Sequence, residues 1–120
     1  MKETLAAGLE HEVTYTVTKE MVPPHLPVPV LSTPSMVQLI EATCLLGAQP
    51  HLDDDEATVG THICVSHAAP AFVDESVVVR TRLIEVDRRR LRFEVAVTGS
   101  SGTIGEGTHD RFVVDSSNFG

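Results

Sequence analysis

Residues 33 to 49 read TPSMVQLIEATCLLGAQ, and the fold depends on this stretch. Thr33 followed by Pro34 predicts a helix start, with a hydroxyl at the N-cap and then a ring whose fixed φ suits the first helical position. The residues that follow are apolar on nearly every side, as in a helix that packs inside a structure. Glu41 is the exception, because a buried carboxylate is costly unless it is paired, hydrogen-bonded or neutralised. Glu41 is therefore the first candidate functional residue.

The composition narrows the class of protein. The 120 residues predict a single domain over residues 1–120. Nine basic and seventeen acidic residues give a net charge of −8, which argues against binding to nucleic acid or to an anionic membrane. Cys44 and Cys64 lie in apolar runs without the spacing of a disulfide framework, and the N-terminal residues lack a signal-peptide pattern. No segment is suited to span a bilayer, so we expect a soluble, cytoplasmic protein.

Alternation of apolar and polar residues predicts five strands around this helix. A loose arm over residues 1–9 and a proline-rich connection over residues 21–32 are also expected. Short turns join the last four strands, which predicts an antiparallel sheet with the apolar helix buried along one face, an α+β fold. An edge strand left unpaired in a monomer favours a homodimer. The strands are expected over residues 10–18, 57–69, 76–86, 91–98 and 103–114.

The strand predicted over residues 57–69 carries a second candidate. Regular alternation directs Val59, Val65 and His67 towards the helix. A carboxylate beside an imidazole can orient the ring and make it a base near neutral pH, which favours a site containing Glu41 and His67. A core histidine bonded to the backbone explains His67 equally well. Gly60 marks a place where the strand bulges or approaches a ligand closely.

Thr33 is a further candidate because of its place at the helix N-terminus. Free N–H groups and the positive end of the helix dipole suit a carbonyl oxygen or an oxyanion there, although an ordinary N-cap threonine needs no such role. The eight helical positions from Thr33 to Glu41 correspond to a rise of roughly 12 Å. A site that uses both residues therefore needs His67 between them, or residues from two chains.

The last predicted strand places His109 and Arg111 on one face with two glycines, Gly105 and Gly107. Close packing of the helix explains the glycines at least as well as a ligand does. Arg111 can pair with a carboxylate, a neighbouring chain or a phosphate. The Arg88–Arg90 run is more typical of a solvated turn than of a phosphate clamp.

Metal and cofactor chemistry find little support in the sequence. His62 and Cys64 share a strand with His67, but regular alternation puts His67 on the opposite face, so we predict no metal site. There is no phosphate loop, no nucleotide fingerprint and no Gly-x-Ser-x-Gly elbow. We expect no cofactor.

Four segments follow one another from the first connection to the end of the last strand: VPPH (22–25), VLSTPSMVQLIEATC (30–44), VGTHICVSHAA (59–69) and GEGTHDRFVV (105–114). Together they resemble the fluoroacetyl-CoA thioesterase group of the hot-dog superfamily. The resemblance implies a hot-dog fold, in which an antiparallel sheet wraps around one long central helix, and a homodimer with the active site near its interface.

The same resemblance implies a role for individual residues. Thr33, Glu41 and His67 take the catalytic positions, and Gly60 and Arg111 take substrate-binding positions. The implied activity is hydrolysis of a short-chain acyl-CoA thioester to the free acid and coenzyme A, with Glu41 as nucleophile or general base. The alternatives are a hydratase or dehydratase on the same fold, which releases no thiol, and a non-catalytic acyl-CoA-binding protein.

The sequence departs from this group in one connection. The fluoroacetyl-CoA enzyme has a longer, aromatic-bearing lid between its VPPH segment and its helix, whereas only LPVPVLS intervenes here. The resemblance therefore implies an acyl-CoA substrate without defining its acyl group.

Overall fold

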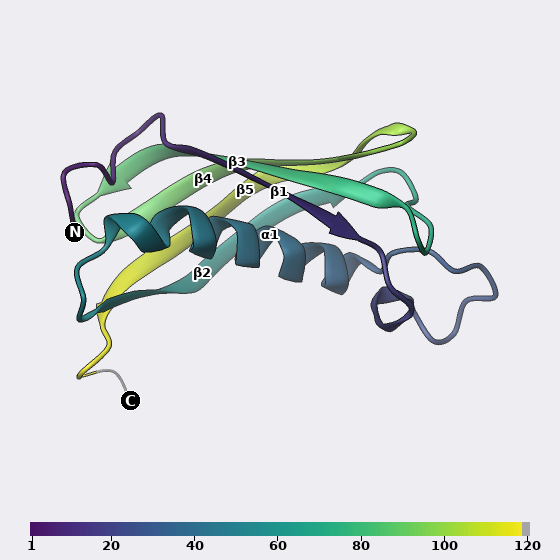
Figure 1. The fold of residues 1–120 in the computed structure, drawn as a ribbon, viewed down its shortest axis with the longest axis horizontal. Helices are drawn as coiled ribbons and strands as arrows, with labels where there is room; N and C mark the ends of the chain where they lie inside the picture. Colours follow the sequence, from purple (N-terminus) through teal and green to yellow (C-terminus); the bar gives the residue numbers. More distant parts are fainter. Residues whose placement is uncertain (119–120) are drawn as a thin grey trace.

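The computed structural model describes residues 1–118 as one antiparallel sheet with a long helix on one of its faces (Figure 1). The sheet order is β1-β3-β4-β5-β2, so β1 and β2 form its two edges. This arrangement confirms the predicted α+β class and the order of one strand, a helix and four strands. The elements are β1 (Glu10–Thr16), η1 (Lys19–Met21), α1 (Thr33–Ala48), η2 (Gln49–His51), β2 (Glu56–His67), β3 (Ser76–Asp87), β4 (Arg90–Gly99) and β5 (Gly102–Asp115).

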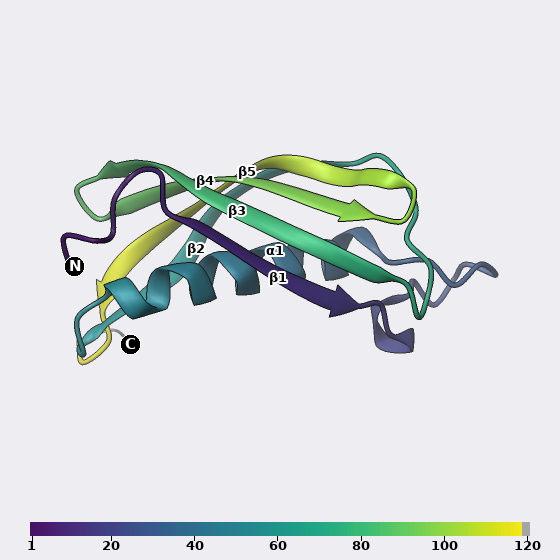
Figure 2. The same ribbon diagram turned by 45° about the horizontal axis from the view of Figure 1, so that its top comes forward.

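The helix α1 packs mainly against β1 and β3 and less against β2 and β4 (Figure 2). Met36 and Ile40 are fully buried in the aliphatic core that β3 and β4 complete. Gly47 permits the close approach to β1, because a Cβ there would lie 2.8 Å from the Cβ of His11. Since the helix lies towards the β1 edge, it covers the inner face of β2 less closely.

The start of α1 differs from the prediction by one residue. Ser32, not Thr33, is the N-cap, and its Oγ accepts a hydrogen bond of 3.2 Å from the N–H of Ser35. Thr33 is the first helical residue and Pro34 the second, where a missing N–H costs nothing. The Thr33 hydroxyl is therefore not used for capping and remains able to bond to another element.

The strand β2 contains a bulge at Thr61. Gly60 pairs with Arg111 of β5 and His62 pairs with the preceding residue of β5, Asp110, which leaves Thr61 as the extra residue. The bulge expected near Gly60 is thus confirmed. An extra residue reverses the alternation of side chains along the strand from that point on.

This reversal corrects the predicted inner face of β2. Thr58, which is only 7% exposed, and Gly60 face inward before the bulge, whereas Val65 and His67 face inward after it. The prediction that Val59 shares a face with Val65 and His67 was therefore wrong, because it assumed an unbroken strand.

The N-terminal residues correct another expectation. They do not form a loose arm, because Leu5 is 6% exposed and belongs to the core. The backbone N–H of Lys2 bonds to the carbonyl of His51, and that of Gly8 bonds to the carbonyl of Leu83. These contacts hold the segment against η2 and β3. The strand ends agree with prediction to within two residues. Among residues 1–118, no helix is long and apolar enough to cross a membrane.

Candidate active site

The start of α1 and the end of β2 meet through a side-chain hydrogen bond. Thr33 Oγ1 lies 2.8 Å from Nδ1 of His67. The bulge makes this contact possible, because it turns His67 to the side of the sheet on which α1 lies. Thr33 and His67, which the sequence suggested separately, therefore form one pair.

The N-terminus of α1 offers fewer free backbone N–H groups than the four that an uncapped helix leaves without a partner. Pro34 has no N–H, and the N–H of Ser35 is bonded to Ser32. The N–H of Met36 bonds to the carbonyl of Ser32. Within residues 1–118, the N–H of Thr33 is the one donor of this first turn without a partner. An oxyanion at this position would thus meet the N–H of Thr33 and the side chains of the Thr33–His67 pair.

Glu41 projects from the middle of α1 into a cavity beside β2. It is half-buried, and with Gly60, His109 and the residues of the bulge it lines a volume of about 370 Å³. A methyl group built on Gly60 would lie 3.5 Å from Oε2 of Glu41 and 3.2 Å from Cε1 of His109. The absence of a side chain at Gly60 therefore keeps open the space in front of the carboxylate.

Glu41 and His67 line different cavities of the single chain. His67 lines a separate space of about 270 Å³ with Val30 and Leu31. No hydrogen bond joins Glu41 to His67 in the part of the chain that the structure describes. Within one chain, the imidazole that lies beside the Glu41 carboxylate is that of His109, not that of His67 as predicted.

Arg111 lies next to the Glu41 cavity, with its Nη1 3.5 Å from a methyl group built on Gly60, and is only 4% exposed. Its Nε donates to Oγ1 of Thr58 at 2.8 Å, its Nη2 donates to the carbonyl of Thr58 at 3.0 Å, and its Nη1 lies 3.2 Å from Nε2 of His109. No carboxylate forms an ion pair with Arg111 among residues 1–118. Burial lowers the pKa of the guanidinium, and Glu41 opposes that shift.

Cys44 lies one helical turn after Glu41 and is fully buried. Burial raises the pKa of its thiol to about 12. The thiol is therefore protonated at neutral pH. Because only the thiolate is a good nucleophile, Cys44 is not a candidate nucleophile for the site around Glu41. Among residues 1–118, no three His, Cys, Asp or Glu side chains are grouped as metal ligands.

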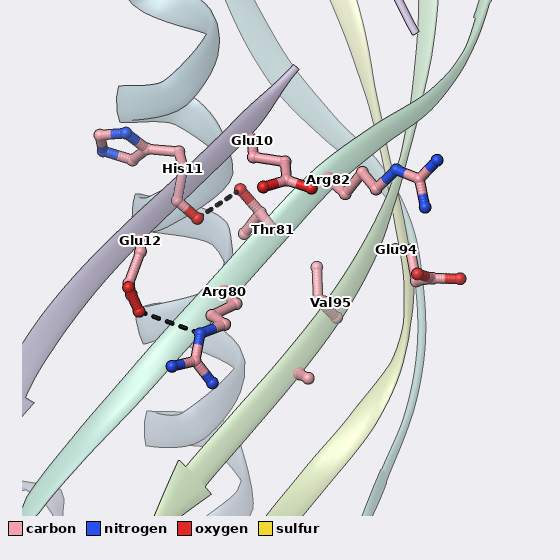
Figure 3. A pocket seen from close by; sticks show the side chains of 9 residues that line it. Glu10, His11, Glu12, Arg80, Thr81, Arg82, Glu94 and Val95 are labelled. Atoms are coloured by element: carbon pink, nitrogen blue, oxygen red, sulfur yellow. Dashed lines mark hydrogen bonds and ion pairs between the residues drawn. The ribbon is translucent and has the colours of Figure 1, made fainter. Parts of the chain in front are cut away.

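A larger groove of about 570 Å³ lies over β1, β3 and β4 (Figure 3). Its rim carries charges of both signs next to one another, including Arg80 and Glu12 in a 2.9 Å ion pair. None of the predicted site residues lines it, and it lies towards the edge of the sheet opposite β2. The predicted site residues therefore lie on the β2 side of the sheet and not in this groove.

Known proteins with this arrangement identify the family. Residues 9–117 match the family model described as fluoroacetyl-CoA-specific thioesterase. The chain belongs to this family. A fluoroacetyl-CoA thioesterase of Streptantibioticus cattleyicolor is 38% identical over 85 residues, which make up 71% of this chain and 61% of that protein. The matched part thus spans less than two thirds of this relative.

Solved structures of the fluoroacetyl-CoA-specific thioesterase family agree with the fold. One structure of a fluoroacetyl-CoA thioesterase superposes with a TM-score of 0.89 at 30% identity, over 95% of this chain and 91% of that chain. A variant of such an enzyme in complex with fluoroacetate and CoA gives a TM-score of 0.88 at 31% identity, over 96% of this chain and 99% of that chain. The hot-dog fold implied by the sequence is confirmed.

Two residues of the site were not singled out from the sequence. His109 was placed on one face with Arg111 but received no role, and Thr58 was not considered, because an alternation that turns Val59 inward turns Thr58 outward. The position of Thr58 follows from the bulge, which only the pairing of β2 with β5 reveals. The alternation of His109 with Arg111 was the one available signal for His109.

Proposed function

We propose that the protein is an acyl-CoA thioesterase, which hydrolyses a short-chain acyl-CoA thioester to the free acid and coenzyme A. The observation that carries this proposal is the position of Glu41, whose carboxylate faces the open space above Gly60. The family supports a thioester as substrate, and the related enzyme in complex with CoA supports the CoA group. In the reaction, oxygen replaces sulfur on the carbonyl carbon, and the CoA thiolate leaves and takes up a proton.

Glu41, Thr33 and His67 divide the chemistry in this proposal. Glu41 either takes the proton from the attacking water or attacks the carbonyl carbon itself, after which water hydrolyses the acyl-enzyme. Thr33, through its hydroxyl and its N–H, polarises the carbonyl oxygen and stabilises the oxyanion. His67, whose Nδ1 contacts Thr33, moves a proton to the leaving thiolate or to water.

Gly60 and Arg111 form the wall that meets the acyl group. The space above Gly60 is bounded by Glu41, His109 and Arg111, with the nearest atoms of all three within 3.5 Å of an added methyl group. A wall that close favours a short acyl chain. The buried guanidinium, which has no carboxylate partner among the described residues, supplies a positive field for the polar end of the substrate.

A homodimer would bring the two separate cavities together. The edge strand β2 is exposed from Gly60 to Cys64. Antiparallel pairing of two β2 edges, with the two-fold axis at or next to Ile63, would set Gly60 of one chain opposite Ser66 or His67 of the other. Glu41 of one chain would then share a site with Thr33 and His67 of the second copy.

The cellular setting completes the proposal. Residues 1–120 form a single domain in this proposal. We place the protein in the cytoplasm, because Cys44 and Cys64 are both free thiols in the described chain.

A panel of acyl-CoA thioesters with detection of free thiol tests the activity. We expect thiol release that is fastest with short acyl groups. Release from none of the panel contradicts the proposal, and conversion of enoyl-CoA to hydroxyacyl-CoA without thiol would identify a hydratase instead. Binding of acyl-CoA without either reaction would identify a binding protein.

Removal of the Thr33 hydroxyl is expected to slow turnover. Thr33→Ala should lower kcat about 100-fold, the scale of a lost oxyanion donor, whereas Thr33→Ser keeps the hydroxyl and should retain most of the activity. Since Ser32 supplies the cap, neither change removes the capping bond. Steady-state kinetics with thiol detection, together with thermal melting, measure both effects. Equal kcat for the two variants would contradict a role for the hydroxyl.

Mixed dimers test whether the site spans two chains. Glu41→Gln and His67→Ala homodimers should each be inactive, but heterodimers formed by mixing them should contain one intact site. Random exchange of subunits is then expected to restore about a quarter of the wild-type activity. A mixture of Thr33→Ala and His67→Ala dimers is the matched control and should stay inactive, because both changes affect the same half of the site. No recovery in the first mixture, after exchange is verified by mass, contradicts the shared site.

A further inference from the structure

The buried histidine of β5 has its protonation fixed by its two neighbours. Nδ1 of His109 lies 2.8 Å from the carbonyl oxygen of His62, which can only accept a hydrogen bond. Nε2 lies 3.2 Å from Nη1 of Arg111, which can only donate one. His109 must therefore carry its single proton on Nδ1 and present a lone pair on Nε2 to Arg111.

A protonated ring would not fit this arrangement. Its second N–H would face the guanidinium of Arg111, and two cations would meet at a place where His109 is 1% exposed. Burial lowers the pKa of His109, and the positive charge of Arg111 lowers it as well. The hydrogen bond to the His62 carbonyl and the charges of Glu41 on α1 and Asp110 on β5 oppose this shift without cancelling it. The neutral form is therefore the stable one at neutral pH.

The consequence concerns Arg111. Its Nε and Nη2 are held by Thr58, and its Nη1 is held by the lone pair of His109. His109 is in turn anchored to the carbonyl of His62, directly after the bulge. The ring thus links the bulge of β2 to the guanidinium group of Arg111, which borders the space above Gly60.

We propose that His109 is a positioning residue for thioester hydrolysis, in which its neutral, Nδ1-protonated ring holds Arg111 at the acyl pocket. This inference rests on the proposed function for its kinetic effect, but not for the state of the ring. It assigns His109 no contact with the reacting atoms. The role requires a hydrogen-bond acceptor at the position of Nε2. Two substitutions of His109 test this acceptor separately from the donor at Nδ1.

The pair is His109→Gln and His109→Asn. The Gln side chain can place its carbonyl oxygen near the position of Nε2 and so keep the acceptor for Arg111. The shorter Asn side chain can donate to the His62 carbonyl but leaves Nη1 of Arg111 without its acceptor. We expect kcat/KM within about threefold of wild type for Gln and a loss of about 10-fold to 100-fold for Asn, the scale of a lost hydrogen bond to a charged group.

Two readouts distinguish positioning from a merely structural role. Thermal melting of both variants, with His25→Gln and His25→Asn as controls on an exposed histidine, shows whether folding explains any loss. Nitrogen NMR of the imidazoles in the wild-type protein should show His109 protonated on Nδ1, and mostly neutral at the pH where an ordinary histidine, with a pKa of about 6.5, is half protonated.

The role of His109 and the proposed thioesterase activity are tested by different outcomes. Equal kcat/KM for the Gln and Asn variants, a proton on Nε2, or titration of His109 at an ordinary pKa would each overturn it. If the wild-type protein releases no thiol, the proposed function fails, and the same NMR spectra together with the guanidinium signals of Arg111 still report whether the ring holds Arg111. Loss of order at Arg111 in His109→Asn but not in His109→Gln supports the inference in that case.

Discussion

Glu41→Gln is expected to lower the rate of thiol release from short acyl-CoA thioesters by about 10³-fold, the scale of a lost general base. The amide has nearly the same size as the carboxylate, but it can neither take a proton from water at neutral pH nor attack the carbonyl carbon. Because Glu41 is half-buried beside an open cavity and makes no hydrogen bond that the structure records, the fold is expected to persist. Thiol release under saturating substrate, with thermal melting, measures the effect.

Glu106→Gln is the matched control for this substitution. Glu106 is exposed on β5 and lies outside the cavity, so its change should leave both activity and melting unaltered. If Glu41→Gln and wild-type protein release thiol at equal rates, Glu41 has no role in the chemistry and the proposed mechanism is wrong.

Gly107→Ala is expected to destabilise the fold by about 3–5 kcal/mol, at the upper end of single substitutions. A Cβ at Gly107 would lie 2.0 Å from the carbonyl oxygen of Cys64 and 2.7 Å from the Cα of Val65. Both atoms belong to the backbone of β2, which cannot move aside without losing hydrogen bonds to β5. Denaturant unfolding followed by circular dichroism measures the change in the free energy of unfolding.

The same substitution at Gly60 provides the comparison. A Cβ there would contact only side-chain atoms, at 3.2 to 3.5 Å, so Gly60→Ala should fold with little loss of stability. It should instead raise KM for the larger acyl groups of the panel by filling part of the acyl pocket. Similar stability for Gly107→Ala and wild-type protein would show that the two strands are not held as closely as the structure indicates.

Periodicity in the sequence was sufficient to predict the helix and the strands. The helix is nearly all apolar and begins at a hydroxyl–proline pair, and β4 alternates regularly with Leu91, Phe93, Val95 and Val97 all buried. Such patterns depend on neighbours in the chain, so they can be read without knowledge of the fold. The proximity of Thr33 and His67 was not predicted as a hydrogen bond, but both residues were correctly placed at element ends that face the same core.

The features that were missed depend on contacts between distant segments. A loose arm was expected because residues 1–9 lack periodicity, yet Leu5 is held by the core and the backbone of Lys2 by η2. The roles of Thr58 and His109 depend on the pairing of β2 with β5, which is set in three dimensions. His67 was predicted as the neighbour of Glu41 because both face the inner side of the sheet, but His67 lies beside Thr33 at the start of α1, whereas Glu41 lies beside His109.

The extra residue at Thr61 means that β2 serves two purposes that one regular strand cannot combine. An odd number of positions separates Gly60 from His67, yet both face the inner side of the sheet. The open acyl pocket and the Thr33–His67 pair therefore exist together only if β2 keeps the extra residue of its bulge. In chimaeras between related chains, the segment from Thr58 to His67 must be exchanged as one unit, since a crossover that drops one residue would keep either half of the chemistry but not both.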